Sequence, residues 1–93
     1  GKTRFQELLA RSGKYIPMIA KVLSQEGLPE ELGYLPLLES EFIATNISRA
    51  GAVGLWQFVA STARQYGLRI DEWIDERRDP VKSTRAAARY LKD

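Results

Sequence analysis

The sequence predicts an all-α, mainly helical fold made of one small domain over residues 1–93. Apolar residues recur at the three- and four-residue spacing of a helix, and capping residues, prolines and glycines separate the periodic segments. No segment shows the apolar–polar alternation of a half-buried strand. The chain is 44% hydrophobic and 28% charged, which is typical of a globular protein with a modest core.

The N-terminal part of the chain predicts two helices. The first covers residues 3–11, and its apolar residues share one face: Phe5, Leu8 and Leu9. Ser12, a residue type favoured at helix N-termini, precedes the second helix, from about 13 to 26. The apolar face of this second helix consists of Tyr15, Ile16, Ile19, Val22 and Leu23. Gly27 follows it as a C-terminal stop signal.

A third helix is predicted over residues 29–41, with Pro29 in its first turn. Pro36 lies inside this helix, where it removes the backbone hydrogen bond to Leu32. We therefore expect a single helix with a kink at Pro36.

A folded loop is predicted over residues 43–54, which contain asparagine, serine and two glycines. We expect a short helical turn at 55–58 after this loop. A further helix is predicted at 60–66, and Gly67 stops it.

The last predicted helix covers residues 80–92, because Asp79 and Pro80 are a cap followed by a first-turn proline. Its inner stripe consists of Val81, Thr84, Ala88 and Leu91. The connecting residues 68–74 show no clear pattern of either helix or strand.

The composition excludes several kinds of chemistry. The chain contains no cysteine and no histidine, which removes thiol nucleophiles, disulfides, serine–histidine–aspartate arrangements and most transition-metal sites. Acid–base chemistry near neutral pH must then come from a carboxyl with a shifted pKa, or from lysine or tyrosine. The net charge of +2 does not by itself indicate nucleic-acid binding. No stretch is apolar enough to span a bilayer, and the N-terminus lacks a signal-peptide core.

Glu39 is the main candidate for chemistry, because it shares a predicted helix face with three apolar residues: Leu32, Leu35 and Phe42. Burial on that face would raise the pKa of Glu39, and a carboxyl that stays protonated near neutral pH is a general acid. The competing interpretation is that Glu39 lies near the helix end, partly hydrated or paired with an arginine.

The other carboxyls are poorly placed as partners for Glu39. Glu41 projects roughly 200° away around the same helix. The remaining candidates lie in a distant acidic segment: Asp71, Glu72, Asp75 and Glu76. Arg77 and Arg78 follow directly, so we favour surface ion pairing as the role of this segment.

The loop after Glu39 carries features of a ligand site. Gly51 and Gly54, with Ala50 and Ala52 beside them, allow close backbone approach to another surface or a ligand. Trp56 offers a flat apolar face and Gln57 offers a donor and acceptors, which together suit a sugar bearing amide groups. The competing interpretation is that Trp56 and Phe58 pack in the core.

Several motifs occur together and in order: Glu39-Ser40, Phe42, Ser48, Gly51-Ala52, Gly54-Leu55-Trp56-Gln57, Asp75-Glu76-Arg77-Arg78-Asp79-Pro80 and Ala86-Ala87-Ala88-Arg89-Tyr90-Leu91. This pattern resembles the soluble lytic transglycosylase (SLT) domain, in the branch of the membrane-bound murein transglycosylases D. The resemblance extends from about Tyr15 to Leu91.

The resemblance implies a lysozyme-like transglycosylase domain, without cofactor or metal, in the bacterial cell envelope and periplasm. It implies cleavage of the β-1,4 bond between N-acetylmuramic acid and N-acetylglucosamine in peptidoglycan, with a 1,6-anhydromuramoyl product. Glu39 would be the single acid/base, and the sugar's 6-hydroxyl the nucleophile. The implied substrate-binding residues are Ser40, Ser48, Gly54, Leu55, Trp56 and Gln57, of which Ser40 would also hold the helix end and the Glu39 carboxyl.

The sequence departs from the family pattern in two places. Ile43-Ala44 stands where relatives often have Asn-Pro, in a loop. The family also continues into an Ala-Tyr-Asn-Ala-Gly-type segment, whereas this sequence stops at Asp93 and does not begin with Met. We therefore expect a fragment of the catalytic domain, incomplete at its C-terminus, that lacks one wall of the groove and can self-associate through exposed apolar surface.

Two other functions are compatible with the residues. The chain could bind glycan without cutting it. It could also be a small basic helical protein that binds nucleic acid or another helix, because a basic stripe recurs at helical spacing: Lys82, Arg85, Arg89 and Lys92. We favour a solvated helix face as the explanation of this stripe, and the resemblance implies no nucleic-acid partner.

Overall fold

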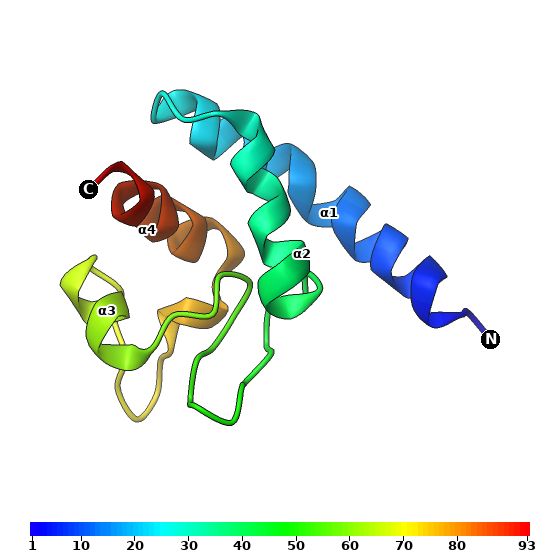
Figure 1. Ribbon diagram of the computed structural model, residues 1–93. Coiled ribbons are helices and arrows are strands. Elements are labelled where there is room, and N and C mark those ends of the chain that lie inside the picture. The colour runs from blue at the N-terminus through cyan, green and yellow to red at the C-terminus, as the bar shows by residue number, and fades with distance from the viewer.

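The computed structural model describes residues 1–93 and is mainly helical, with no strands (Figure 1). The elements are α1 (Arg4–Gln25), the 3-10 helix η1 (Glu30–Tyr34), α2 (Leu35–Ser40), α3 (Ala60–Gln65), the 3-10 helix η2 (Glu76–Arg78) and α4 (Pro80–Lys92). The only β-type pairings are three isolated bridges. The predicted all-α fold is therefore confirmed.

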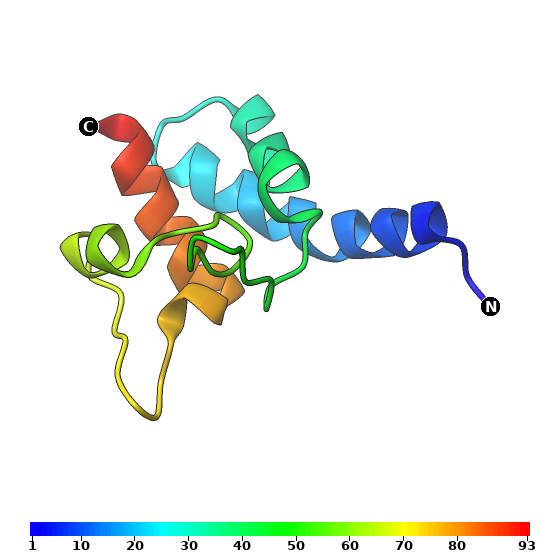
Figure 2. The same cartoon turned by 60° about the horizontal axis from the view of Figure 1, so that its bottom comes forward.

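Helix α1 is one continuous helix, so the predicted break at Ser12 is wrong. Thr3 caps the helix and forms a reciprocal capping box with Gln6, which satisfies backbone donors at both positions. The Ser12 hydroxyl instead donates to the carbonyl of Leu9, inside the helix, at 2.8 Å. The N-terminal turns of α1 project away from the rest of the molecule (Figure 2).

The C-terminus of α1 follows the prediction. Gly27 has φ +72°, the left-handed conformation that glycine adopts without strain. The next amide, of Leu28, donates back to the carbonyl of Leu23 at 2.9 Å, which closes the helix end.

The third predicted helix is divided at Pro36 rather than kinked. Pro29 precedes η1, and Pro36 occupies the first turn of α2, where its missing N–H costs nothing. Helix α2 ends at Ser40 because Glu41 and Phe42 both have left-handed backbone, with φ 52° and 58°. Phe42 therefore leaves the helix and packs into the core.

The chain from residue 43 to 59 is a folded loop, as predicted. Antiparallel bridges connect Val53 with Ile47 and with Phe58, and the expected helical turn at 55–58 is not helical. Helix α3 follows, and Gly67, with φ +87°, ends it as predicted.

Helix α4 begins as predicted, because the Asp79 carboxylate accepts from the amide of Lys82 at 2.9 Å. Its inner face differs from the predicted stripe and consists of Ser83, Thr84, Ala86, Ala87 and Ala88. Val81 is exposed and Leu91 is only half-buried. Both core clusters include residues of α4, so the helix is packed on two sides. A broad face of small side chains is therefore buried, in place of the single narrow apolar stripe that was predicted.

Two clusters form the core. The first joins α1, the loop and α4 through Ile19, Val22, Leu23, Phe42, Leu55 and Ala88. The second lies between α3 and α4 and contains Phe58, Ala63, Leu68, Ala86 and Ala87. Trp56 packs against both clusters, so it connects the two halves of the core.

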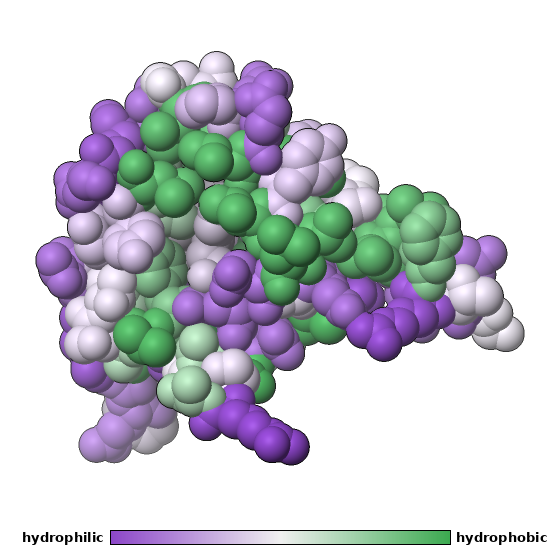
Figure 3. Space-filling view, in the orientation of Figure 1, coloured by the Kyte–Doolittle hydropathy of each residue, from purple (hydrophilic) through white to green (hydrophobic).

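Apolar side chains also remain on the surface. In Figure 3 they form a band that runs across the visible face toward the N-terminal turns of α1. Phe5 and Leu9 on α1 and Leu38 on α2 are exposed, and Leu38 has 81% of its surface accessible. Self-association through apolar surface stays a prediction.

Candidate active site

A pocket of about 340 Å³ opens between α2, the loop end and the last helix. Its ten lining residues are Leu35, Glu39, Trp56, Gln57, Phe58, Val59, Thr62, Ala87, Tyr90 and Leu91. Seven of them are hydrophobic, and Glu39 is the only carboxyl among them. The structure thus brings the predicted acid and the predicted tryptophan–glutamine pair to one cavity.

Glu39 lies one helical turn after Leu35, and both line this pocket. The predicted burial of Glu39 is wrong, since its side chain is exposed. The expected apolar neighbour Phe42 turns into the core after the end of α2, and the adjacent Leu38 points into solvent.

Glu39 also borders a second, shallower depression, lined by Arg4, Leu38, Ser40, Glu41, Ile43 and Asn46 in addition to Glu39 itself. The carboxyl of Glu39 takes part in none of the ion pairs or hydrogen bonds within the chain, whereas Glu41 pairs with Arg4. Glu39 therefore lines both the pocket and the shallower depression, and its carboxylate oxygens are free to bind a ligand.

Ser40 is buried, and its hydroxyl lies 2.8 Å from the carbonyl of Leu55 and 3.1 Å from the carbonyl of Pro36. Its one proton can be donated to either oxygen. Ser40 therefore holds the end of α2 against the loop, which places Glu39 beside Trp56.

Within the Gly54-Leu55-Trp56-Gln57 turn, Trp56 and Gln57 line the pocket, whereas Gly54 and Leu55 are buried behind them. Gly54 has φ +91°, and a Cβ built there would lie 1.9 Å from the carbonyl oxygen of Arg77, so only glycine fits. Leu55 is fully buried in the first core cluster. The indole of Trp56 is half-buried, and its Nε1–H donates to Thr84 on α4 at 2.9 Å.

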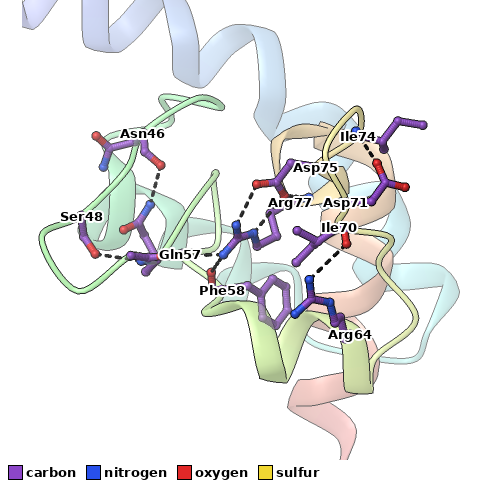
Figure 4. A network of polar contacts seen from close by, with 12 residues as sticks. Asn46, Ser48, Gln57, Phe58, Arg64, Ile70, Asp71, Ile74, Asp75 and Arg77 are labelled. Atoms are coloured by element: carbon purple, nitrogen blue, oxygen red, sulfur yellow. Dashed lines mark hydrogen bonds and ion pairs between the residues drawn. The ribbon is translucent and has the colours of Figure 1, made fainter.

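Gln57 lines the pocket, and its side-chain amide has one end bonded within the chain and one end free. Its Nε2 donates to the carbonyls of Gly54 and Asn46, at 2.9 and 3.1 Å (Figure 4). Two carbonyl acceptors fix which end of the amide is the nitrogen. The other end, Oε1, accepts no hydrogen bond within the chain and is not buried, so it is available to a donor in the pocket.

Comparison with known proteins bears on this pocket. Residues 17–93 match the family described as Transglycosylase SLT domain. The chain belongs to the SLT domain family. The predicted lysozyme-like transglycosylase fold is thereby confirmed.

Three known proteins are similar to this chain. The chain is 38% identical over 90 residues to membrane-bound lytic murein transglycosylase D of Escherichia coli (strain K12). This match covers 97% of this chain and 20% of that protein. It is 38% identical over 82 residues to a protein of Alteromonas sp. (strain M-1) named for tributyltin chloride resistance. This match covers 88% of this chain and 40% of that protein. It is 41% identical over 54 residues to peptidoglycan transglycosylase gp16 of Escherichia phage T7. This match covers 57% of this chain and 4% of that protein.

Four predicted site residues of this SLT domain do not line the pocket: Ser40, Ser48, Gly54 and Leu55. Of these, Ser48 belongs to the loop before the Gly54–Gln57 turn. Its hydroxyl accepts from the amide of Ala52 at 3.1 Å, and its own amide donates to the carbonyl of Ala52 at 2.9 Å. Ser48 thus closes the loop that carries the Gly54–Gln57 turn (Figure 4).

Several residues that line the pocket of the SLT domain were not predicted as site residues. Tyr90 lines the pocket and packs edge-on against the ring of Phe58, with 6.2 Å between centroids. Tyr90 belongs to the Ala86–Leu91 motif, and its spacing of three residues from Ala87 puts both on one side of α4, so the sequence did hold a signal for it. Thr62 reaches the pocket from α3.

The acidic segment before α4 combines surface and buried pairs. The exposed pairs Arg69–Asp71 and Lys82–Glu76 agree with the predicted surface role. Arg77 does not, because it is buried beside Asp75. The hydrogen bond from the Arg77 side chain lowers the pKa of Asp75 below its usual value, against a smaller opposing effect of burial. No group of three or more metal-binding side chains is assembled anywhere in the chain.

Proposed function

We propose that this chain carries the catalytic site of a peptidoglycan lytic transglycosylase, which cleaves the β-1,4 bond between N-acetylmuramic acid and N-acetylglucosamine. The observation that carries the proposal is that Glu39, Trp56 and Gln57 line one pocket with no second carboxyl. Membership of the SLT family, and two relatives named as murein or peptidoglycan transglycosylases, support the substrate class.

In the proposed mechanism, Glu39 acts twice. Its carboxyl first donates a proton to the glycosidic oxygen as the bond from that oxygen to C1 of the muramic acid breaks. The resulting carboxylate then takes the proton of the 6-hydroxyl of the same sugar, and O6 bonds to C1. Glu39 ends protonated, as it began, and the product carries a 1,6-anhydro ring.

A single carboxyl is sufficient for this reaction, because the sugar supplies its own nucleophile. A glycosidase of the usual kind needs two carboxyls that face the same bond. Glu41, the nearest alternative along the chain, lies outside the pocket and is paired with Arg4.

The exposure of Glu39 in the free chain is consistent with catalysis in a covered site. A glycan lying over Leu35 and Trp56 would exclude water from the carboxyl and strengthen its electrostatic interactions with the sugar. We propose that Gln57 Oε1 accepts a hydrogen bond from an N-acetyl N–H and that the indole of Trp56 contacts a sugar ring. Ser40, Gly54 and Leu55 lie behind these contacts and support the turn, and Ser48 closes the loop that precedes it.

Digestion of purified murein, followed by mass analysis, tests the proposal. We expect soluble muropeptides with anhydro ends from the wild type and none from Glu39→Gln, with unchanged circular dichroism. Glu41→Gln is the matched control and retains cleavage. Reducing ends in place of anhydro ends would identify a hydrolase, and full turnover by Glu39→Gln would refute its assignment.

Glycan binding without cleavage is the second candidate, because an exposed Glu39 is a less favourable general acid than a buried one. Pull-down by murein without any released product would support it. The basic-stripe alternative is not favoured, since Lys82 pairs with Glu76 and Arg89 donates to the carbonyl of Tyr66.

For the location we propose the bacterial cell envelope, on its periplasmic side. The Escherichia coli relative is named as membrane-bound and as acting on murein, which supports this proposal. None of the helices in the structure has the length and apolar character needed to cross a bilayer.

A further inference from the structure

Arg77 is the only cation that the fold encloses, with 8% of its surface exposed. It lies in η2, directly before α4, and forms a two-point ion pair with Asp75. The Nε and Nη2 atoms lie 2.9 and 2.8 Å from the two carboxylate oxygens. Such a bidentate pair fixes the plane of the guanidinium group and therefore the direction of its remaining nitrogen, Nη1.

That remaining nitrogen is directed at the loop that carries the pocket floor. Nη1 donates to the carbonyls of Gly51 and Phe58, each at 3.2 Å (Figure 4). The main chain of Arg77 also packs directly against Gly54. Arg77 thus contacts the loop at Gly51 before the turn, at Gly54 within it and at Phe58 after it.

Gln57 has a backbone conformation that needs support from its surroundings. Its φ of +55° is left-handed, a conformation that costs energy for any residue other than glycine and persists only where the surroundings enforce it. The loop has no sheet to enforce it, because Val53 and Phe58 form only an isolated bridge. The carbonyl of Phe58, one residue after Gln57, accepts from both Val53 N and Arg77 Nη1.

We propose that Arg77 is a positioning residue for Gln57. Held by Asp75, it fixes the Phe58 carbonyl and so keeps Gln57 in its left-handed conformation, with Oε1 directed to the pocket that contains Glu39. Arg77 does not line this pocket, so any effect on substrate must pass through the loop. This inference rests on the proposed function, in which Gln57 contacts the glycan.

A double-mutant cycle on murein cleavage tests the proposal. Arg77→Lys keeps the charge but loses the fork-shaped donor set, and we expect kcat/KM to fall roughly tenfold with folding preserved. In a Gln57→Ala background the same change should lower kcat/KM less than twofold, since nothing remains to be positioned. Arg78→Lys, at the exposed neighbouring position, is the matched control and should have no effect.

The cycle has two results that would overturn the proposal. An equal loss in both backgrounds would make Arg77 a purely structural residue, and no loss in either would make the contact inconsequential. Absence of cleavage by the wild type would instead count against the proposed function.

A second measurement reads the positioning without any substrate. In the wild type, the nitrogen-15 NMR signal of the Gln57 side-chain amide should show slow hydrogen exchange, because two carbonyls hold Nε2. In Arg77→Lys this exchange should become at least tenfold faster, while Arg78→Lys leaves it unchanged. An unchanged exchange rate in Arg77→Lys would refute the proposal even if the chain proves inactive on murein.

Discussion

Glu39 and Gln57 line the same pocket, yet the chain holds them in opposite ways. Glu39 stands on a short helix with an exposed, unpaired carboxyl, whereas Gln57 is fixed by its own side-chain bonds, a neighbouring bridge and the buried Arg77. The group proposed to transfer protons is left free for the substrate. The surface proposed to recognise the substrate is built rigidly in advance, which lowers the entropy lost on binding.

The difference predicts that changes under the turn affect stability most, and that changes at Glu39 affect it least. The largest loss is expected for Gly54→Ala, because the added Cβ would collide with the Arg77 carbonyl in addition to the backbone strain. We expect a loss of about 3 kcal/mol or more in the free energy of unfolding. Urea denaturation followed by circular dichroism measures it.

Gly51→Ala is the matched control for Gly54→Ala. Gly51 has a similar φ of +81° but open space around the position of a Cβ. Only the left-handed strain remains, about 1 kcal/mol. Equal losses in the two variants would mean that the contact with Arg77 does not constrain the turn.

Asp75→Asn is expected to cost the next largest amount, about 2 kcal/mol at pH 7, because it leaves the buried Arg77 without its counter-charge. The pKa of Asp75 is lowered in the folded state, so its contribution is complete above its unfolded value of about 4. That contribution is lost as pH falls through the lower folded value. Urea midpoints from pH 7 to pH 2 should therefore converge for wild type and variant.

The control for Asp75→Asn is Asp71→Asn, whose partner Arg69 is exposed. Its cost should stay below about 1 kcal/mol, as for other surface pairs. A gap between wild type and Asp75→Asn that stays constant down to pH 2 would contradict the role assigned to the carboxylate.

Thr84→Val should have a smaller effect, about 1 kcal/mol, because it removes the hydroxyl that accepts from the Trp56 indole and donates to the carbonyl of Pro80 within α4. Thermal unfolding would measure a decrease of a few degrees. Thr62→Val, on the pocket wall but without a side-chain hydrogen bond within the chain, is the control. If the two variants unfold at the same temperature, the hydrogen bond to Trp56 contributes nothing to the stability of the fold.

The smallest effect on stability is expected at the proposed acid. Glu39→Gln should change the free energy of unfolding by less than about 0.5 kcal/mol, since the carboxyl is exposed and unpaired. Urea midpoints would check this. A loss of several kcal/mol would show that Glu39 is part of the structure and not a free group awaiting substrate.

Features with a local cause could be predicted from the sequence. Gly27 and Gly67 end helices because left-handed backbone favours glycine, and Asp79 begins α4 through its own side chain. The pairing of Glu39 with Gln57 in one pocket also followed from the motif pattern.

Features that depend on distant contacts could not be predicted in this way. Arg77 lies in a charged segment typical of a surface, and its burial depends on carbonyls 19 and 26 residues away. The exposure of Glu39 follows from the left-handed backbone of Phe42, which turns an apolar residue away and which no periodic pattern encodes. Ser12 resembles a cap, but the capping box at Thr3 and the packed turns around Ile19 sustain one helix.

The placement of the two tryptophans has a practical consequence. Trp56 touches both core clusters and the pocket, whereas Trp73 has 87% of its surface in solvent. The fluorescence of a Trp73→Phe chain would therefore come from one indole alone. Its emission would report whether the two core clusters stay in contact during unfolding. In a titration with a glycan, the same emission would report binding in the pocket.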